Sequence, residues 1–142
     1  MKMEGYNIEN LSIYITNKGY RRFDDLRDKE SAAKAVELIT KAVESETLER
    51  LDAFYGDMEA YYISIYMEKS CFALVIHDEI KGMSYNYKNL KYKDDKTEVA
   101  LAGYYFPKMI TCEDKETLMD IIIYFFETGS INEKYEWYGK RD

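Results

Sequence analysis

Hydrophobic and polar residues alternate with a period of two in two segments of the chain, which predicts half-buried strands. The first is residues 11–16 (LSIYIT), in which every second residue is a large aliphatic one. The second is residues 60–67 (AYYISIYM), which places Tyr61, Ile63, Ile65 and Met67 on one face and Tyr62, Ser64 and Tyr66 on the other. Each of these strands should bury one face only.

Further strands are predicted by apolar runs. Residues 71–77 (CFALVIH) are almost continuously apolar, which favours a central strand covered on both faces. Residues 99–106 (VALAGYYF) predict another interior strand, with Gly103 as a bulge or a point of close approach and Pro107 as its end. Weaker patterns predict strands at residues 48–55, 84–88 and 135–138.

A helical period replaces the alternation in residues 30–45. Its apolar positions share one face: Ala32, Ala35, Val36, Ile39, Ala42 and Val43. Acidic and basic residues three and four positions apart occupy the opposite face, where they can pair with each other: Glu30, Lys34, Glu37, Lys41 and Glu44. Residues 21–29 (RRFDDLRDK), which precede this helix, look like a connection with one helical turn.

A second helix is predicted in the segment that follows Pro107. Thr111 can cap its first turn, and Asp114, three residues later, can complete a capping box. The apolar residues up to Phe126 cover more than one stripe of this helix, so we expect it to be buried on two sides. Gly129 follows as a left-handed C-terminal cap.

These elements predict one α+β domain that spans residues 1–142. We expect a mainly antiparallel sheet of about five to six strands with two principal helices, one N-terminal and amphipathic, one C-terminal and buried. The chain contains no apolar run long enough to cross a membrane, and its first ten residues lack the features of a secretory signal. We therefore expect a cytoplasmic protein without a membrane partner, whose oligomeric state the sequence leaves open.

The net charge of −7 disfavours a general nucleic-acid-binding protein, which needs a cationic surface. Residues 81–108 are an exception to this acidic net charge, with 6 basic and 3 acidic residues. Tyrosine is unusually frequent, at 15 of 142 residues. Because tyrosine is enriched in protein interfaces, this composition favours a protein that binds another protein.

Residues that could support catalysis are few. His77 is the only histidine, and about 20 Å of strand separates it from Cys71, so these two cannot form a nucleophile–base pair. A pair of His77 with Cys112 stays open, as does a disulfide between the two cysteines, although two reduced thiols fit a cytosolic chain better. We expect no metal site, no cofactor and no enzymatic activity; a pair of carboxylates is the remaining enzymatic alternative.

Residues 85–98 (YNYKNLKYKDDKTE) interleave tyrosines with lysines. We interpret this segment as a charged edge hairpin whose lysines prevent edge-to-edge pairing. It could also serve as a protein-binding edge, or as a platform for a small ligand or single-stranded nucleic acid. The candidate partner-binding residues combine expected exposure with residue types that are frequent in hot spots. They are Tyr62, Tyr66, Tyr85, Tyr87, Tyr92, Asp94, Asp95 and Glu98.

The C-terminal third of the chain resembles a known family. An aromatic segment that ends in proline (residues 104–107) precedes a capped helix that ends in Phe125-Phe-Glu-Thr-Gly129, and Glu136-Trp137 follows after a short gap. This arrangement resembles the Imm1 family of bacterial immunity proteins over residues 100–138. The matching residues Phe125, Thr128, Gly129 and Trp137 look structural.

The resemblance implies an antitoxin of a polymorphic toxin or contact-dependent inhibition system. Such a protein is made in the cytosol, binds one cognate toxin domain and neutralises it without catalysis. The acidic net charge would speed the encounter with a basic toxin, such as a nuclease, by electrostatic steering.

Overall fold

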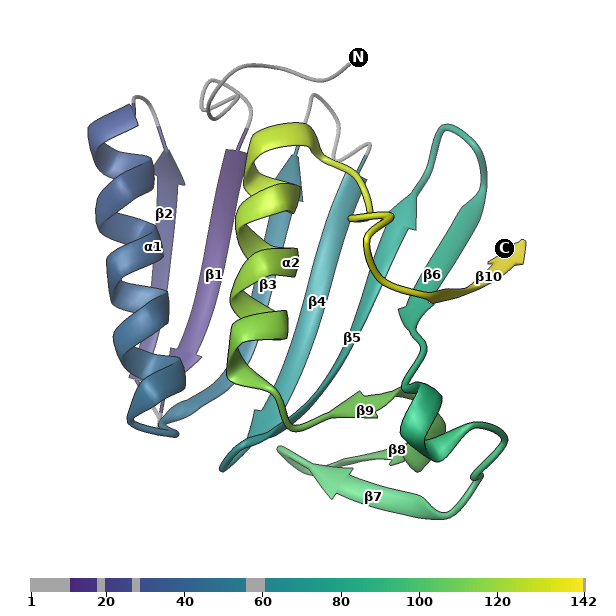
Figure 1. Cartoon of the computed structure of the whole chain (residues 1–142). Helices are drawn as coiled ribbons and strands as arrows, with labels where there is room; N and C mark the ends of the chain where they lie inside the picture. Colours follow the sequence, from purple (N-terminus) through teal and green to yellow (C-terminus); the bar gives the residue numbers. More distant parts are fainter. Residues whose placement is uncertain (1–10, 18–19, 27–28, 56–60, 142) are drawn as a thin grey trace.

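The computed structural model describes residues 11–17, 20–26, 29–55 and 61–141. It confirms the α+β class: two α-helices lie on one face of an antiparallel sheet (Figure 1). The sheet has eight strands, more than the sequence predicts, in the order β10-β6-β5-β4-β3-β1-β2, with the short β9 paired to β5. Within the described ranges, no helix is long and apolar enough to span a membrane.

The first half of the chain forms five neighbouring strands of the sheet and the first helix. Its elements are β1 (Leu11–Asn17), β2 (Tyr20–Leu26), α1 (Lys29–Glu44), β3 (Leu48–Tyr55), β4 (Tyr61–Glu68) and β5 (Cys71–Asp78). The register sets Ile13 opposite Ala53, Ala53 opposite Ile63, and Ile63 opposite Ile76. These four side chains are at most 2% exposed, so the predicted alternation is confirmed and defines the face that packs against the helices.

Strand β2 replaces the helical connection expected at residues 21–29, so that prediction was wrong. Its seven residues pair with β1 over their full length, and it forms one edge of the sheet. Its sequence carries four charged residues in seven, which hid the strand from a search for apolar alternation. Charged residues are nevertheless common in edge strands, where they discourage pairing with another chain.

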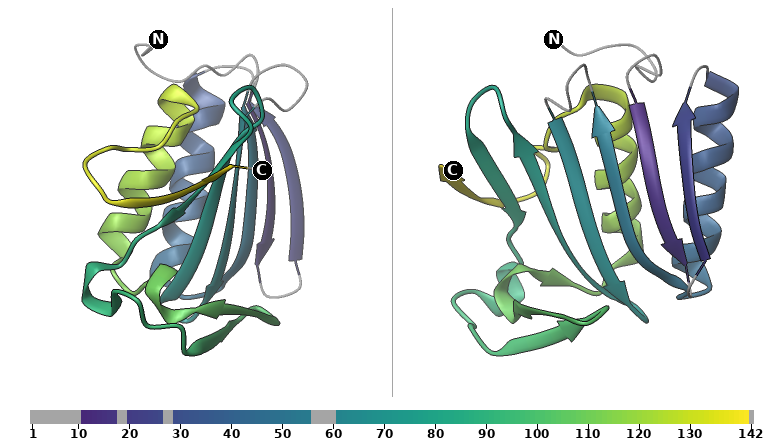
Figure 2. Two further views of the ribbon diagram at one scale, coloured as in Figure 1. Left: turned by 90° about the vertical axis from the view of Figure 1, so that its right-hand side faces the viewer. Right: turned by 180° about the vertical axis from the view of Figure 1, so that it is seen from behind.

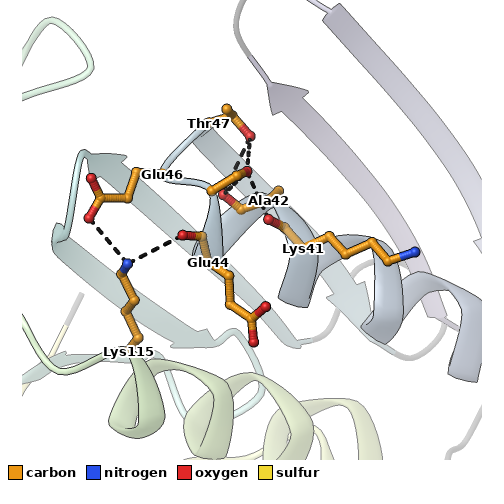
Figure 3. A network of polar contacts seen from close by, with 7 residues as sticks. Lys41, Ala42, Glu44, Glu46, Thr47 and Lys115 are labelled. Atoms are coloured by element: carbon orange, nitrogen blue, oxygen red, sulfur yellow. Dashed lines mark hydrogen bonds and ion pairs between the residues drawn. The ribbon is translucent and has the colours of Figure 1, made fainter.

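Helix α1 is amphipathic as predicted. Its predicted apolar positions are buried except for Val36, which is half-buried. Two ion pairs follow the expected spacing on the exposed side: Lys34 with Glu30 at 3.3 Å and Lys41 with Glu37 at 3.0 Å. Lys115, the first residue of α2 (Lys115–Thr128), connects the two helices. Its ammonium group lies 3.1 Å from the Glu46 carboxylate and 3.5 Å from the Glu44 carbonyl oxygen (Figure 3).

The start of α2 differs from the prediction and its end does not. Asp114 is the N-cap: its carboxylate accepts hydrogen bonds from the Glu116 amide and the Thr117 hydroxyl, at 3.1 and 2.9 Å. Thr111 cannot cap this helix because it lies in β9 (Thr111–Cys112), where it pairs with β5. Gly129 is left-handed, with φ 71°, and its amide donates to the Phe125 carbonyl, which confirms the predicted C-terminal cap.

The expectation that α2 is buried on two sides was also wrong. Its buried residues form one broad face that packs against the sheet: Thr117, Leu118, Ile121, Ile122, Phe125 and Phe126. Glu116 and Asp120 are exposed on the other side, while Met119 and Ile123 are half-buried at the margin. The apolar pattern therefore reflects a wide single interface rather than two.

Residues 98–107 form a hairpin outside the main sheet. Strand β7 (Glu98–Leu101) pairs with β8 (Tyr104–Pro107) through a turn at Ala102 and Gly103, both with positive φ. The expected interior strand with a bulge at Gly103 is therefore wrong, although Pro107 does end β8. An uninterrupted apolar run gave no sign of the turn, because alanine is a rare residue at positive φ.

The C-terminal strand closes the other edge of the sheet. Strand β6 (Met83–Tyr87) pairs with β5 on one side and with β10 (Trp137–Arg141) on the other. Residues 85–98 thus do not form an edge hairpin, and that interpretation was wrong. The closing strand also begins two residues later than the expected 135–138.

Both helices lie on the same side of the sheet, and no described helix covers the opposite side (Figure 2). Strand β5 shows the consequence. Phe72, Leu74 and Ile76 are buried against the helices, whereas Val75 and His77 on the other side are only half-buried. The prediction that β5 is covered on both faces was therefore wrong for its second half, and the sheet retains an open face.

Candidate functional site

A row of aromatic side chains crosses the open face from β1 to β5. Tyr14 lies edge-on to Phe54 with ring centroids 5.8 Å apart, and Phe54 lies 5.6 Å from Tyr62. Tyr62 stacks on His77 at 4.2 Å, and the His77 ring shares a hydrogen bond of 2.8 Å with the Ser84 hydroxyl of β6. The register sets Phe54, Tyr62, His77 and Ser84 opposite one another, so that these four side chains and Tyr14 come from five neighbouring strands.

Three rings of this row, those of Phe54, Tyr62 and His77, turn their faces toward one another. The planes of Tyr62 and His77 differ by only 21°, and Phe54 flanks Tyr62 on its other side with a tilt of 33°. The two faces of Tyr62 are thus directed at its neighbours. A base or a sugar that binds by stacking needs an exposed ring face, and Tyr62 does not offer one.

A polar cluster lies next to the aromatic row, on strands β3 and β4. Arg50 donates through Nε and Nη2 to the Asp52 carboxylate, at 2.8 and 3.4 Å. The same carboxylate accepts a hydrogen bond of 2.7 Å from the Ser64 hydroxyl. Asp52 therefore holds the guanidinium group of Arg50 in a fixed orientation on the open face.

Aromatic rings flank the guanidinium group of Arg50. Its central carbon lies 4.6 Å from the ring centre of Tyr66 and 5.9 Å from that of Tyr104, both within the range of cation–π contacts. The rings of Tyr104 and Phe106 also pack on Tyr66, which fixes the β7–β8 hairpin at one end of the open face. Burial raises the pKa of the Tyr66 hydroxyl, which keeps it protonated and able to donate a hydrogen bond.

We call this surface the aromatic face. It comprises Tyr14, Arg50, Phe54, Tyr62, Tyr66, His77 and Tyr104. Tyr14 and Tyr104 are about half exposed, at 48% and 51%, while most of the others are half-buried. The aromatic face therefore combines exposed tyrosine with an oriented arginine, the residue types that dominate binding hot spots.

The structure separates the residues that the sequence predicted as partner-binding. Tyr62 and Tyr66 lie on the aromatic face. Tyr85 and Tyr87 lie on the helix-covered side of β6, where Tyr85 pairs with the buried Ile76. Tyr87 packs edge-on against Trp137, and burial raises the pKa of its hydroxyl.

The remaining predicted residues lie between the 3-10 helix η3 (Leu90–Tyr92) and the start of β7, near a second 3-10 helix, η4 (Lys108–Ile110). They are Tyr92, Asp94, Asp95 and Glu98. Lys108 and Lys91 contact the Tyr92 ring, with their nitrogens 4.5 and 5.3 Å from its centre. Asp95 accepts hydrogen bonds from Thr97, which lower the pKa of its carboxyl. We call this region the basic corner because its lysines form no ion pair with any described residue: Lys88, Lys91, Lys93, Lys96 and Lys108.

The geometry removes one enzymatic arrangement that the sequence left open. Cys112 pairs with Phe72 and shares its helix-covered side, whereas His77 lies five residues further along β5, about 16 Å away, on the open side. His77 and Cys112 therefore cannot act as base and nucleophile. Cys71 and Cys112 are free thiols, and burial raises the pKa of each. In the part of the chain that the structure describes, no three potential metal ligands come together.

The residues that carry the family resemblance are structural in this fold. Phe125 is fully buried, Gly129 caps α2, and the Trp137 indole donates to the Asn132 carbonyl oxygen at 2.9 Å. Comparison of the chain with protein-family models, with curated proteins and with solved structures finds no match. The argument for function therefore depends on the surface of the molecule.

Five residues of the aromatic face were not among the sequence candidates: Tyr14, Arg50, Phe54, His77 and Tyr104. A signal existed for the first four, because each belongs to a strand in which it alternates with buried residues. The sequence could not supply the register that brings these strands side by side. Tyr104 was placed in an interior strand, so its exposure was not expected.

Proposed function

We propose that this protein is an immunity protein of the Imm1 type, which binds a cognate toxin domain and neutralises it by protein–protein contact. The observation that carries the proposal is the aromatic face, a side of the sheet that no described helix covers, where β1, β3, β4 and β5 present aromatic side chains and an oriented arginine. Antiparallel sheets often leave one face to solvent, but that face is then normally polar. An aromatic open face favours a binding surface.

The chemistry of the surface supports protein binding over catalysis. Tyrosine and arginine give large contact areas at low entropic cost and are enriched at the centres of interfaces. The only histidine stacks on Tyr62 and shares a hydrogen bond with the Ser84 hydroxyl. We therefore propose that the chain occludes or distorts the toxin and performs no chemistry itself.

The net charge of −7 supports a basic toxin, of which a nuclease is one kind. Long-range attraction between opposite net charges raises the rate of encounter, and it weakens with added salt. We place this activity in the cytoplasm, where an immunity protein meets an incoming toxin.

A module that binds a small ligand or single-stranded nucleic acid is the alternative. The basic corner supports it, because two of its lysines, Lys91 and Lys108, contact the Tyr92 ring. The positions of Tyr85 and Tyr87 on the helix-covered side count against it, since these are two of the three tyrosines, with Tyr92, that were expected to form the stacking platform.

Co-expression tests the proposal. The chain is produced together with the toxin domain that a neighbouring reading frame encodes, and survival of the cells is measured. We expect the wild type and Tyr105→Ala to protect and Tyr104→Ala to protect poorly. Tyr105 is the matched control, because it is 72% exposed on the opposite side of the same strand.

Failure of the wild type to protect against that toxin would refute the proposal. Salt-sensitive binding of single-stranded DNA or RNA in a gel-shift assay, lost when lysines of the basic corner are replaced, would favour the alternative.

A further inference from the structure

Strand β2 is the last strand of the sheet at the edge opposite β10 (Figure 1). It pairs with β1 over its full length, and no described strand pairs with its outer side. An edge strand offers a row of backbone N–H and C=O groups to a further strand. This edge can therefore extend the sheet, provided that the side chains of the added strand suit those of β2.

The charges of β2 follow an order that is complementary to itself. The strand reads Tyr-Arg-Arg-Phe-Asp-Asp-Leu, with two cations before Phe23 and two anions after it. In an antiparallel pair of two such strands centred on Phe23, Arg21 stands opposite Asp25 of the second copy, and Arg22 stands opposite Asp24. Each copy supplies the same pairs, so four pairs of opposite charge and one aromatic pair meet across the edge.

From this order we infer that β2 binds β2 of a second copy of this chain, antiparallel and centred on Phe23. Charged residues normally protect an edge strand, because most partners would set like charges or apolar groups opposite them. The one strand that escapes this protection is β2 itself. The inference does not depend on the proposed function, since it concerns the edge of the sheet and gives the protein a two-fold symmetric dimer.

The backbone is compatible with this register. In an antiparallel strand, each residue directs its N–H and C=O groups to the same side, and successive residues direct them to opposite sides. Residues that pair in this register, such as Arg21 and Asp25, are always an even number of positions apart. Both therefore direct their backbone groups to the same edge, and the ladder of hydrogen bonds closes whichever alternate set faces outward.

The position of α1 and the sequence of the other edge agree with this choice. Helix α1 contacts both β2 and β3, and β3 is the third strand from this edge, so the helix lies over the face of the sheet. Strand β10 at the other edge carries Lys140 and Arg141 and no acidic residue. Self-pairing of β10 would set no opposite charges against each other, so the charge pattern selects β2.

The dimer would also enlarge the aromatic face. Opposite residues of an antiparallel pair lie on the same side of a sheet, so both copies keep their open faces on one side. Phe23 pairs with Tyr14 of β1, whose ring begins the aromatic row. The two aromatic faces therefore meet at the two-fold axis and form one surface.

Sedimentation velocity of the full chain over a series of concentrations tests the inference. We expect a dimer that added salt weakens. The double variants Arg21→Asp with Arg22→Asp, and Asp24→Arg with Asp25→Arg, each turn all four pairs into like-charge pairs. Each should raise the dissociation constant of the dimer about 100-fold or more, and an equal mixture of the two should restore it, because every pair is then of opposite charge.

A control separates this effect from the change in net charge. Lys93 and Lys96 are exposed and lie between η3 and β7. The double variant Lys93→Asp with Lys96→Asp changes the net charge as much as the double arginine variant does, and it should dimerise as the wild type does. Circular dichroism shows whether each variant is folded.

A cysteine cross-link tests the register and does not depend on the charge variants. In the dimer, the Cα atoms of the two residues at position 23 are about 5 Å apart, within the range of a disulfide. Phe23→Cys should therefore form a covalent dimer with oxidised glutathione, whereas the wild type, with Cys71 and Cys112 alone, should not.

Four results would overturn the inference. They are a wild type that is monomeric at every concentration, a dimer that withstands both charge reversals, folded charge variants whose mixture stays monomeric, and a Phe23→Cys variant that forms no cross-link.

Discussion

Replacement of Asp52 by alanine removes an acceptor that two strands share. In the wild type, the Asp52 carboxylate accepts hydrogen bonds from Arg50 on its own strand and from Ser64 on the neighbouring strand. The side chain of Asp52 is only 18% exposed, and Ser64 is 8% exposed. The substitution should therefore leave a buried hydroxyl without its partner and release the guanidinium group of Arg50.

The expected loss of stability follows from these two contacts. A buried donor that loses its acceptor costs ~1 kcal/mol. The half-exposed pair with Arg50 adds about 0.5 kcal/mol after solvent screening is taken into account. We expect Asp52→Ala to lower the free energy of unfolding by about 1.5 kcal/mol and the melting temperature by roughly 5 °C, whereas Asp52→Asn, which keeps one acceptor for Ser64, should cost ~0.5 kcal/mol.

Urea unfolding, followed by the fluorescence of the single tryptophan, Trp137, measures these differences. A double-mutant cycle of Asp52→Ala, Arg50→Ala and the variant with both substitutions isolates the contribution of the Arg50–Asp52 pair to the free energy of unfolding. If Asp52→Ala is as stable as the wild type, or if Asp52→Asn costs as much as Asp52→Ala, the hydrogen-bond argument is wrong.

Three further changes test other parts of the structure. Gly129→Ala should lower the free energy of unfolding by ~1 kcal/mol in urea titrations, because a side chain at φ 71° is strained; equal stability would contradict the cap. Tyr138→Phe should leave the melting temperature unchanged or raise it, because the Tyr138 hydroxyl is buried with no partner among the described residues; a clear decrease would reveal a missed hydrogen bond. The hydrogen bond that the Tyr135 hydroxyl donates to Asp120, 2.6 Å long, lowers the pKa of the Asp120 carboxyl below its ordinary value of 3.8. Asp120 therefore stabilises the fold above pH 3.8, and this contribution is lost as the pH falls through the pKa of the folded state. Asp120→Asn should lose less stability than the wild type on acidification below about pH 4, and parallel pH profiles would contradict the assignment.

The sequence predicted the parts of the fold that depend on local patterns. Alternation identified β1 and β4, the helical period identified α1, and Gly129 marked the end of α2. These predictions succeeded because each pattern directly reflects one buried face. Local signals failed where charge or an unusual turn residue concealed the structure, as in β2 and at Ala102 between β7 and β8.

The site was less predictable because it depends on contacts that are distant in sequence. Tyr62 and Tyr66 were found, since alternation alone places them opposite the buried face of β4. Arg50 could not be recognised as a candidate from the sequence, because its surroundings depend on the pairing of β3 with β4 and on the hairpin that packs Tyr104 against Tyr66. Tyr85 and Tyr87 were expected to be exposed. However, β10 pairs with β6 along its length, and the ring of Trp137 packs against that of Tyr87.

The central claim is that a protein partner binds the aromatic face, and one comparison of affinities tests it most directly. Isothermal titration calorimetry would measure binding of the neighbour-encoded toxin domain to the wild type, to Tyr104→Ala and to Tyr105→Ala. We predict that Tyr104→Ala weakens binding at least 30-fold, the effect of losing a hot-spot tyrosine of ~2 kcal/mol, while Tyr105→Ala binds as the wild type does. Undiminished binding by Tyr104→Ala, or an equal loss in both variants, would contradict the account.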